Sequence, residues 1–182
     1  MRTPTLTDGV VILDAHTPAD VLPHLAGEDD EQARRFGWYP ARSTEETVRT
    51  AISRWREQWT AEGPTRAFAL RVGATGVLAG GCEVRLGQSG RAEMSYWVFP
   101  PFRGRGLAAR GVKLLCEWAF ADLNVARLEL YIEPDNLASR AVARGAGFVE
   151  EGHLREHEAT TEGRRDMVLY SLLPSDRSPQ DS

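Results

Sequence analysis

Three stretches in the middle of the chain carry the hydrophobic pattern of β-strands. They are Ala67 to Val72, Gly76 to Leu86 and Arg91 to Phe99, and glycine-containing turns separate them. Consecutive strands joined by such short turns usually pair in antiparallel fashion. The pattern therefore predicts an antiparallel meander.

Apolar residues at helical spacing precede and follow this meander. They predict a helix that ends near Glu62, and Ser43 with Glu46 forms a capping-box signature at its start. The other predicted elements are strands at Gly9 to Asp14, Arg127 to Ile132, Phe148 to His157 and Arg165 to Leu173, and helices at His16 to Glu28, Gly104 to Phe120 and Asn136 to Gly145. This order predicts an α+β fold with mixed strands and helices.

Length and composition place these elements in one domain. A chain of 182 residues, 42% hydrophobic and 26% charged, has the size and composition of one soluble globular domain. We expect this domain over residues 5–173 and a polar, disordered tail over residues 174–182. No apolar stretch approaches the roughly 18 residues that span a bilayer, and the start lacks a secretory signal. A cytoplasmic protein without membrane contact is predicted.

Charge and cysteine usage narrow the function classes. A net charge of −4 argues against a general nucleic-acid binder, which needs a basic excess, and it suits a cationic substrate. Cys82 and Cys116 lack C-x-x-C and metal-ligand spacing, so free buried thiols are predicted. The histidines show no metal spacing either, and we predict no metal site.

The segment most informative about function lies between a predicted strand and a predicted helix. It reads Pro-Pro-Phe-Arg-Gly-Arg-Gly-Leu-Ala-Ala over residues 100–109. Its glycines let backbone N–H groups converge, the helix N-terminus adds partial positive charge, and Arg103 and Arg105 flank Gly104. These features predict a pyrophosphate-binding site, with a plain glycine-rich turn as the alternative.

The same segment also satisfies a dinucleotide-binding pattern. Gly104, Gly106 and Ala109 fit G-x-G-x-x-G/A, and Glu129 follows about 20 residues downstream. That fingerprint should begin a series of parallel β-α-β units, whereas here a meander comes first and only about 75 residues follow. The context therefore disfavours a dinucleotide fold.

Three motifs in this order resemble the GNAT superfamily of N-acetyltransferases. The sequence Arg103-x-x-Gly106-x-Ala108 is similar to the acyl-CoA loop of that family, and residues 92–98, Ala-Glu-Met-Ser-Tyr-Trp-Val, resemble the strand before it. Residues 136–148 resemble its N-x-x-S…G-F helix and turn, as found in the branch that acetylates ribosomal-protein N-termini. That branch usually has glycine at the position of Ser95 and an acidic residue early in the loop helix, so the acceptor can differ here.

The resemblance runs from about residue 5 to residue 173 and implies a fold and a donor. It implies a central, mostly antiparallel, V-shaped sheet of about seven strands flanked by helices, with acyl-CoA inserted where two central strands splay. Asp166 also fits the final strand of the family. The donor implied is acetyl-CoA, a co-substrate. The CoA-binding residues expected are Val98, Phe99, Arg103, Gly104, Arg105, Gly106, Leu107, Ala108 and Asn136, where backbone N–H groups near Val98 and Phe99 polarise the thioester carbonyl.

Amide formation from a thioester requires a neutral amine, a stabilised oxyanion and a stabilised or protonated thiolate. Glu93 lies in a segment otherwise suited to burial, so we predict a desolvated carboxylate with a raised pKa that takes the amine's proton directly or through water. A strand glutamate that faces solvent or pairs with Arg91 is the alternative. Ser139 is predicted to assist the leaving thiolate, with a helix-surface serine as its alternative. Asn136 either caps its helix alone or also contacts the pantetheine arm.

The acceptor is the least defined part of this interpretation. Candidate walls of the acceptor pocket are the aromatic loop, with Phe36, Trp38 and Tyr39, and the helix face that carries Trp55 and Trp59. For these two tryptophans the alternative is a core stripe on an amphipathic helix. The acidic runs near residues 29 and 45 are candidates to attract a cation. The sequence predicts acetyl transfer to a protein N-terminal or small-molecule amine by direct attack on the thioester, with a non-catalytic acyl-CoA sensor as the rival and a homodimer as a possible assembly.

Overall fold

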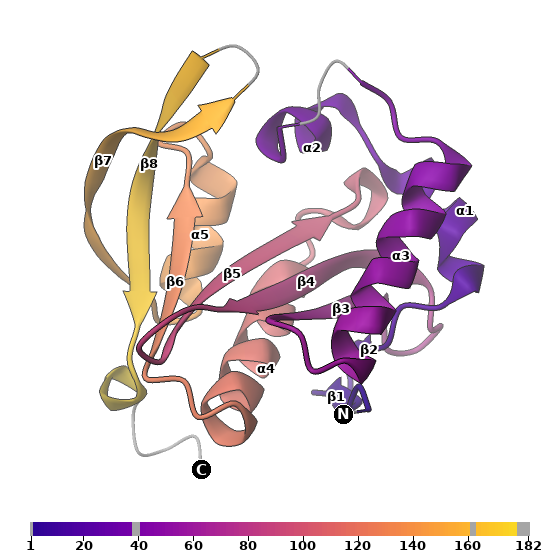
Figure 1. Ribbon diagram of the computed structural model, residues 1–182, viewed down its shortest axis with the longest axis horizontal. Helices are drawn as coiled ribbons and strands as arrows, with labels where there is room; N and C mark the ends of the chain where they lie inside the picture. Colours follow the sequence, from indigo (N-terminus) through magenta and orange to yellow (C-terminus); the bar gives the residue numbers. More distant parts are fainter. Residues whose placement is uncertain (1, 38–40, 161–162, 178–182) are drawn as a thin grey trace.

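The computed structural model describes residues 2–37, 41–160 and 163–177, which form one eight-stranded sheet with helices packed against it (Figure 1). The strand order is β1-β2-β3-β4-β5-β6-β8-β7. The strands are β1 (Leu6–Thr7), β2 (Val11–Asp14), β3 (Thr65–Val72), β4 (Leu78–Leu86), β5 (Arg91–Val98), β6 (Arg127–Ile132), β7 (Val149–Thr160) and β8 (Gly163–Leu172). The helices are α1 (Val21–Gly27), α2 (Asp30–Arg35), α3 (Glu45–Thr60), α4 (Leu107–Asp122) and α5 (Leu137–Gly145), with short 3-10 helices η1 (Pro18–Asp20), η2 (Pro100–Phe102) and η3 (Pro174–Asp176).

The sheet opens into a V at its centre because β5 and β6 are paired only along their first residues. These two strands run parallel, and their pairing covers Arg91–Glu93 against Arg127–Glu129. Beyond that point they diverge (Figure 1). All other neighbouring strands pair in antiparallel fashion. The predicted mixed, mostly antiparallel, V-shaped sheet is confirmed.

The helices cover the two faces of the sheet with separate apolar clusters. On one face, Val112 and Leu115 of α4 pack against fully buried residues such as Leu70 and Val84. On the other face, α1 and α3 enclose a smaller cluster that contains Val48. Alternation along the strands sends successive side chains to the two faces, so Leu70 of β3 packs under α4 while its neighbour Ala69 lies in a separate small cluster with Trp97.

Most predicted elements are present with boundaries shifted by a few residues. The meander β3-β4-β5, the helix after the glycine-rich loop, and the strand-helix-strand-strand order that follows are confirmed. Two short elements, β1 and α2, were not predicted, and β1 raises the strand count from about seven to eight. The start of α2 lies in the acidic run that reads as a loop by sequence, because Asp29 caps it by accepting from the Gln32 N–H at 2.8 Å.

The predicted capping box at Ser43 and Glu46 is wrong by one residue. Thr44 is the N-cap of α3, and it forms reciprocal hydrogen bonds with Thr47. Both residue pairs have the right spacing, and the extended backbone of Thr44 decides which one is used. Of the predicted tail, residues 174–176 form η3, and residues 178–182 lie outside the described part. None of the helices in the described ranges is both long and apolar enough to cross a membrane.

Candidate active site

The loop between β5 and α4 has the open backbone that its sequence predicts. Gly104 and Gly106 both have φ of +73°, in the left-handed region where a side chain is strained. Gly106 is also the N-cap of α4, and no side chain of the described residues caps the first N–H groups of that helix. These N–H groups and the positive end of the helix dipole together form a site suited to an anion.

The two loop arginines, predicted together as phosphate contacts, have different surroundings. The Arg103 guanidinium donates to Asp29 at 2.7 Å and to Glu31 at 3.0 Å. Burial raises the pKa of Asp29, but the hydrogen bond and charge of Arg103 together with the hydrogen bond from the Gln32 N–H outweigh it, so the pKa is lowered. Arg105 instead lies over the Phe102 ring, 5.7 Å from its centroid. Arg103 therefore ties the loop to the start of α2, whereas Arg105 remains an exposed cation.

A cavity of about 440 Å³, called here the loop pocket, extends from this loop to the start of α5. It also borders α2 and the splayed end of β5. Of the predicted site residues it brings together Val98, Arg103, Gly104, Gly106, Leu107, Ala108, Asn136 and Ser139, whereas Phe99, Arg105 and Glu93 do not line it. One cavity thus unites two motifs that are about 30 residues apart in the chain.

The register of β4 and β5 determines which backbone N–H groups face the gap between β5 and β6. The Phe99 N–H donates to the Ala79 carbonyl at 2.9 Å, so it is already bound within the sheet. The prediction that it polarises a bound carbonyl is therefore wrong. Hydrogen-bonding groups alternate sides along an antiparallel strand, so the Val98 N–H points away from β4, toward the side on which β6 has diverged. Val98 remains the candidate donor.

Side chains of β5 and α5 meet on the opposite wall of the loop pocket. Asn136 accepts a hydrogen bond from the Ser139 N–H at 3.1 Å, which confirms it as the helix cap. The Tyr96 hydroxyl donates to the Ser139 carbonyl at 3.1 Å. Burial raises the pKa of Tyr96 to about 12, so its hydroxyl remains protonated near neutral pH. These contacts place the half-buried Ser139 beside the splayed strand.

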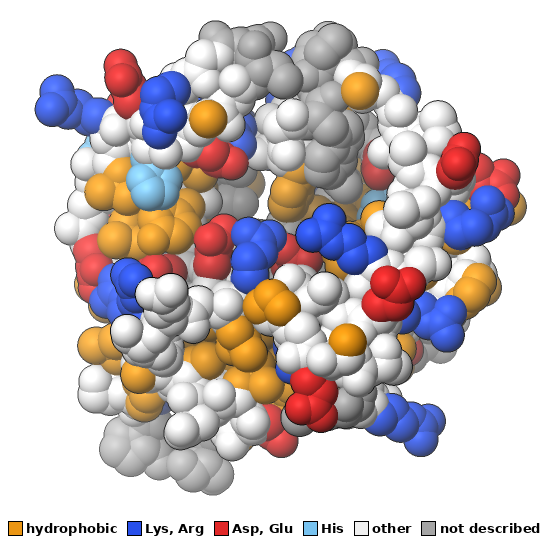
Figure 2. All heavy atoms as spheres, viewed as in Figure 1, with side chains coloured by type: hydrophobic (Ala, Val, Ile, Leu, Met, Phe, Trp, Pro, Cys, Tyr) orange, Lys and Arg blue, Asp and Glu red, His pale blue; other side chains and the backbone are white. Residues whose placement is uncertain are grey.

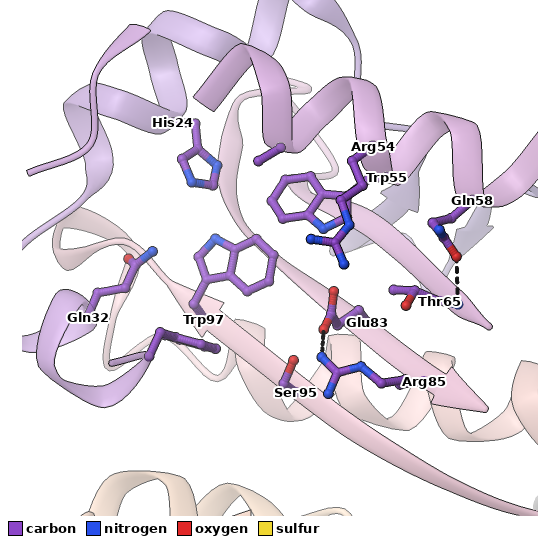
Figure 3. Close-up of a pocket in the computed structure, with 12 residues that line it drawn as sticks. His24, Gln32, Arg54, Trp55, Gln58, Thr65, Glu83, Arg85, Ser95 and Trp97 are labelled. Carbon is purple, nitrogen blue, oxygen red and sulfur yellow. Dashed lines mark hydrogen bonds and ion pairs between the residues drawn. The ribbon is translucent and has the colours of Figure 1, made fainter. Parts of the chain in front are cut away.

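A second cavity of about 340 Å³, called here the sheet pocket, lies over the face of β3, β4 and β5 that α3 covers (Figure 3). Figure 2 shows this side of the molecule hollowed near its centre, with basic side chains along the lower border of the hollow. The sheet pocket is lined by residues from six elements and the segment after α2. Gln32, Phe36 and Trp97 line both cavities, so the two cavities meet at these three residues.

Stacked aromatic rings form the inner wall of the sheet pocket. The Trp55 and Trp97 rings lie 5.6 Å apart between centroids, and His16 stacks on Trp55 at 4.5 Å. Burial lowers the pKa of His16 to about 3, so this imidazole is neutral near pH 7. An added Cβ at Gly81 would lie 2.3 Å from the Trp97 ring, so glycine allows this ring to lie flat against β4.

Three buried polar side chains lie at the end of the sheet pocket where the cavities meet: His24, Gln32 and Trp97 (Figure 3). Each is more than nine-tenths buried. Within the described chain, His24 Nδ1, Gln32 Oε1 and Trp97 Nε1 have no hydrogen-bond partner. An unpaired buried polar group costs about 1–3 kcal/mol, so a polar molecule bound at this end would gain hydrogen bonds.

Glu93 lies on β5 but lines neither cavity. The predicted burial of its carboxylate is wrong: the side chain is 47% exposed, because alternation along β5 places Ala92 and Met94 in the core and turns Glu93 to the open face. Its carboxylate lies 3.8 Å from Arg85 rather than beside Arg91. The desolvation on which its predicted role rested is therefore absent.

Sequence reasoning missed Glu83, a carboxylate that does line the sheet pocket. It lies opposite Ser95 in the register of β4 and β5, its side chain is 13% exposed, and it accepts a hydrogen bond from Arg85 at 3.0 Å. Alternation along β4 could have predicted its face, but only the pairing register places it beside Ser95.

Some of the aromatic residues predicted as acceptor contacts line the cavities, and others lie in the core. Phe36 lines both cavities and Trp55 lines the sheet pocket. Trp59 belongs to the core, where its N–H donates to the Ala67 carbonyl at 2.8 Å. Trp38 and Tyr39 lie outside the described residues. The core-stripe alternative therefore holds for Trp59, whereas Trp55 both lines the sheet pocket and packs against buried residues such as Ala69 and Val48.

The acidic runs expected to attract a cation are engaged in ion pairs. Asp29 binds Arg103, as described above, and Glu45 pairs with Arg49 one turn along α3. An ion-paired carboxylate offers little net attraction to a second cation. The hypothesis of a cation-attracting surface at these runs gains no support from the structure.

The two cysteines are free and buried, as predicted. Burial raises the pKa of both thiols, so both remain protonated near neutral pH. Among the described residues, no group of three His, Cys, Asp or Glu side chains is placed to hold a metal ion.

Comparisons with known proteins agree with this geometry. The sequence profile of the acetyltransferase (GNAT) domain matches residues 11–149. The chain is 34% identical, over 72% of its own length and 72% of the relative's, to YdaF of Bacillus subtilis, whose name assigns it provisionally to the ribosomal N-acetyltransferases. It is 32% identical to p20 of Bacillus licheniformis, named as an uncharacterized N-acetyltransferase, over 62% of its own length and 64% of that protein.

A solved structure shares the fold over nearly the whole chain. RimJ of Mycobacterium smegmatis, in complex with CoA-disulfide, superposes with a TM-score of 0.81 at 23% identity, covering 98% of this chain and 89% of RimJ. With the profile and the relatives, this match confirms the resemblance predicted from residues 92–108 and 136–148.

Proposed function

This chain belongs to the GNAT acetyltransferase family and is an acyltransferase, and from that premise we propose that it transfers the acetyl group of acetyl-CoA to a primary amine. The observation that carries the proposal is the meeting of the loop pocket and the sheet pocket at Gln32, Phe36 and Trp97. A thioester that enters through one cavity can there meet an amine that enters through the other.

The loop pocket is the proposed site of acetyl-CoA. The pyrophosphate lies on the N–H groups that follow Gly106 at the start of α4, and Asn136 contacts the pantetheine arm. The thioester carbonyl accepts from the Val98 N–H, which faces the gap between β5 and β6. The CoA-disulfide in the related RimJ structure is consistent with this donor.

The proposed reaction is direct attack of the amine nitrogen on the thioester carbon. The N–C bond forms and places negative charge on the carbonyl oxygen, which the Val98 N–H stabilises. Collapse of this intermediate breaks the C–S bond, and the departing thiolate accepts a hydrogen bond from the Ser139 hydroxyl and takes its proton from solvent. The attacking nitrogen loses one proton, and the products are the acetylated amine and CoA.

The proton lost by the amine requires an acceptor, and two glutamates face this side of the sheet. Glu93 remains the residue predicted from the sequence, and its exposed position outside both cavities favours the water-mediated form of that role. Glu83 lines the sheet pocket, but its carboxylate already accepts a hydrogen bond from Arg85. We propose transfer through water to Glu93, with Glu83 as the competing acceptor.

CoA release from acetyl-CoA, followed with a thiol reagent over a panel of amines, tests the proposed activity. The panel holds peptides with free N-termini, small amino compounds and their N-acetylated counterparts as matched controls. We expect release only with free amines, in a ratio of one acetylated product per CoA. Tight binding of acetyl-CoA without release for any amine would favour the non-catalytic sensor. A cytoplasmic location and a homodimer remain predictions.

A further inference from the structure

The sheet pocket carries two basic side chains at the end remote from the loop pocket. Arg54 extends from α3 and Arg85 from β4, and both point into the cavity (Figure 3). Gln58 and Thr65 line the same end. A molecule whose amine lies near Trp97, where the cavities meet, would extend its remainder toward these two arginines.

The charges that line this cavity do not cancel. Glu83 is the only carboxylate among the described lining residues, and Arg85 already donates to it at 3.0 Å. Glu93, outside the cavity, lies 3.8 Å from the same guanidinium. Arg54 makes no hydrogen bond or ion pair with any residue in the described part of the chain. The positive charge of Arg54 is therefore not balanced by any carboxylate in the described part of the chain.

A guanidinium is permanently charged and presents its donors as a planar fork that matches a carboxylate. In a half-enclosed cavity its charge is screened less than on an open surface, so it repels a second cation and attracts an anion. The two acidic runs that could have balanced it bind other arginines instead.

We propose that the acceptor is an amine that carries a carboxylate away from its reacting nitrogen, and that Arg54, assisted by Arg85, binds that carboxylate. This rests on the proposed acetyl transfer and narrows its substrate class: an acidic peptide N-terminus or an amino acid is accepted, and a polyamine is rejected. Arg54 is the specificity-determining residue. The idea reverses the expectation, drawn from net charge, of a cationic acceptor.

Three peptide amides that differ at one position test this assignment: Ser-Ala-Glu, Ser-Ala-Gln and Ser-Ala-Lys. Glu and Gln have the same shape, so their ratio of kcat/KM isolates the charge. We expect the Glu peptide to exceed the Gln peptide about tenfold and the Lys peptide to be poorest, with the Glu preference shrinking as salt is added. Arg54→Gln should bring the Glu/Gln ratio close to one, and Arg54→Glu should favour the Lys peptide.

Arg56→Gln provides the matched control. Arg56 lies two residues along the same helix, is exposed and does not line the cavity, so this change removes the same charge without touching the pocket. The Glu/Gln ratio of this variant should stay at the wild-type value. Equal ratios for Arg54→Gln and Arg56→Gln, or a wild-type preference for the Lys peptide, would overturn the assignment.

The panel separates this inference from the proposed function. If the three peptides are acetylated at equal rates, acetyl transfer stands and the charge assignment fails. If acetyl-CoA binds but neither these peptides nor any other free amine releases CoA, the proposed function itself fails. Thermal unfolding and acetyl-CoA affinity of each variant should match wild type, since Arg54 and Arg56 are exposed and make no contact with the loop pocket.

Discussion

The loop pocket and the sheet pocket meet at three residues but are built in opposite ways. One side of the loop pocket comes from a single short segment: all of residues 102–109 except Arg105 line it, and its candidate anion donors are backbone N–H groups. The sheet pocket draws side chains from α1, α2, α3, β3, β4 and β5, with one to four residues from each. The first therefore depends on backbone conformation at a few glycines, and the second on which side chains the fold brings together.

This difference predicts where substitutions act. The proposed donor site should tolerate most side-chain substitutions but not the replacement of its positive-φ glycines. The proposed acceptor site should change its preference among amines when one lining side chain is replaced. The substitutions below test that contrast, beginning with the largest expected effect.

Gly106→Glu should nearly abolish acetyl-CoA binding. The residue at this position has φ of +73° and caps α4, so a side chain adds strain and its carboxylate lies beside the proposed pyrophosphate. Like charges brought together at a binding site cost several kcal/mol, so we expect a loss of about 10³-fold in affinity. Isothermal titration calorimetry with acetyl-CoA measures it.

Gly76→Glu is the matched control for this change. Gly76 has φ of +67°, has open space around it and lies between β3 and β4, away from both cavities. It should show the same backbone strain and charge change with unaltered acetyl-CoA affinity. Gly106→Ala, which adds strain without charge, should lose much less affinity than Gly106→Glu. Wild-type affinity in a folded Gly106→Glu variant would refute the phosphate-loop assignment.

Glu93→Gln should lower turnover at pH 7 by about 10²-fold, at the lower end of the range for general-base catalysis, because the carboxylate acts through water. Acetyl-CoA affinity should not change, since Glu93 does not line the loop pocket. Activity should recover as rising pH deprotonates the amine in solution. The rate against pH, measured with an identified acceptor, tests this.

Glu83→Gln is the companion variant because Glu83 faces the same side of the sheet from the next strand. If Glu83→Gln shows the pH-dependent loss and Glu93→Gln has wild-type turnover, the base assignment moves to Glu83. Losses in both that do not recover at high pH would indicate a structural effect, which thermal unfolding would detect.

The two loop arginines should give the smallest effects and should differ in kind. Arg105→Ala removes an exposed cation and should weaken acetyl-CoA binding about threefold at low salt and hardly at all at high salt. Arg103→Ala breaks the tie to Asp29 at the start of α2, and Gln32 of that helix lines both cavities. It should therefore raise the KM of the acceptor as well as that of acetyl-CoA. Initial rates at two salt concentrations would measure both, and a salt-independent effect of Arg105→Ala would contradict an electrostatic role.

Sequence predicted the conformation of the loop before α4 and the start of α5 well because the signals for both are local. Glycines that need positive φ, a helix start and the Asn136 cap lie within a few residues of their partners, so spacing alone identifies them. Predictions failed where the hydrogen-bond partner is remote in the sequence, or where two neighbouring residues were equally good N-cap candidates. Phe99 was misassigned because its N–H partner, Ala79, lies on another strand. The capping box was misplaced because Ser43 and Thr44 offered the same chemistry.

The sequence by itself therefore determined the family, the order of most elements and the open backbone of the loop before α4. The tertiary structure alone decided that Glu93 is exposed, that Glu83 and Arg54 line one cavity with Trp97, and that Arg103 binds Asp29. The physical reason is that local conformation follows from neighbouring residues, whereas strand register and helix packing bring together side chains far apart in the chain. Which charges face one another, and hence which acceptor the pocket can hold, follows from that register.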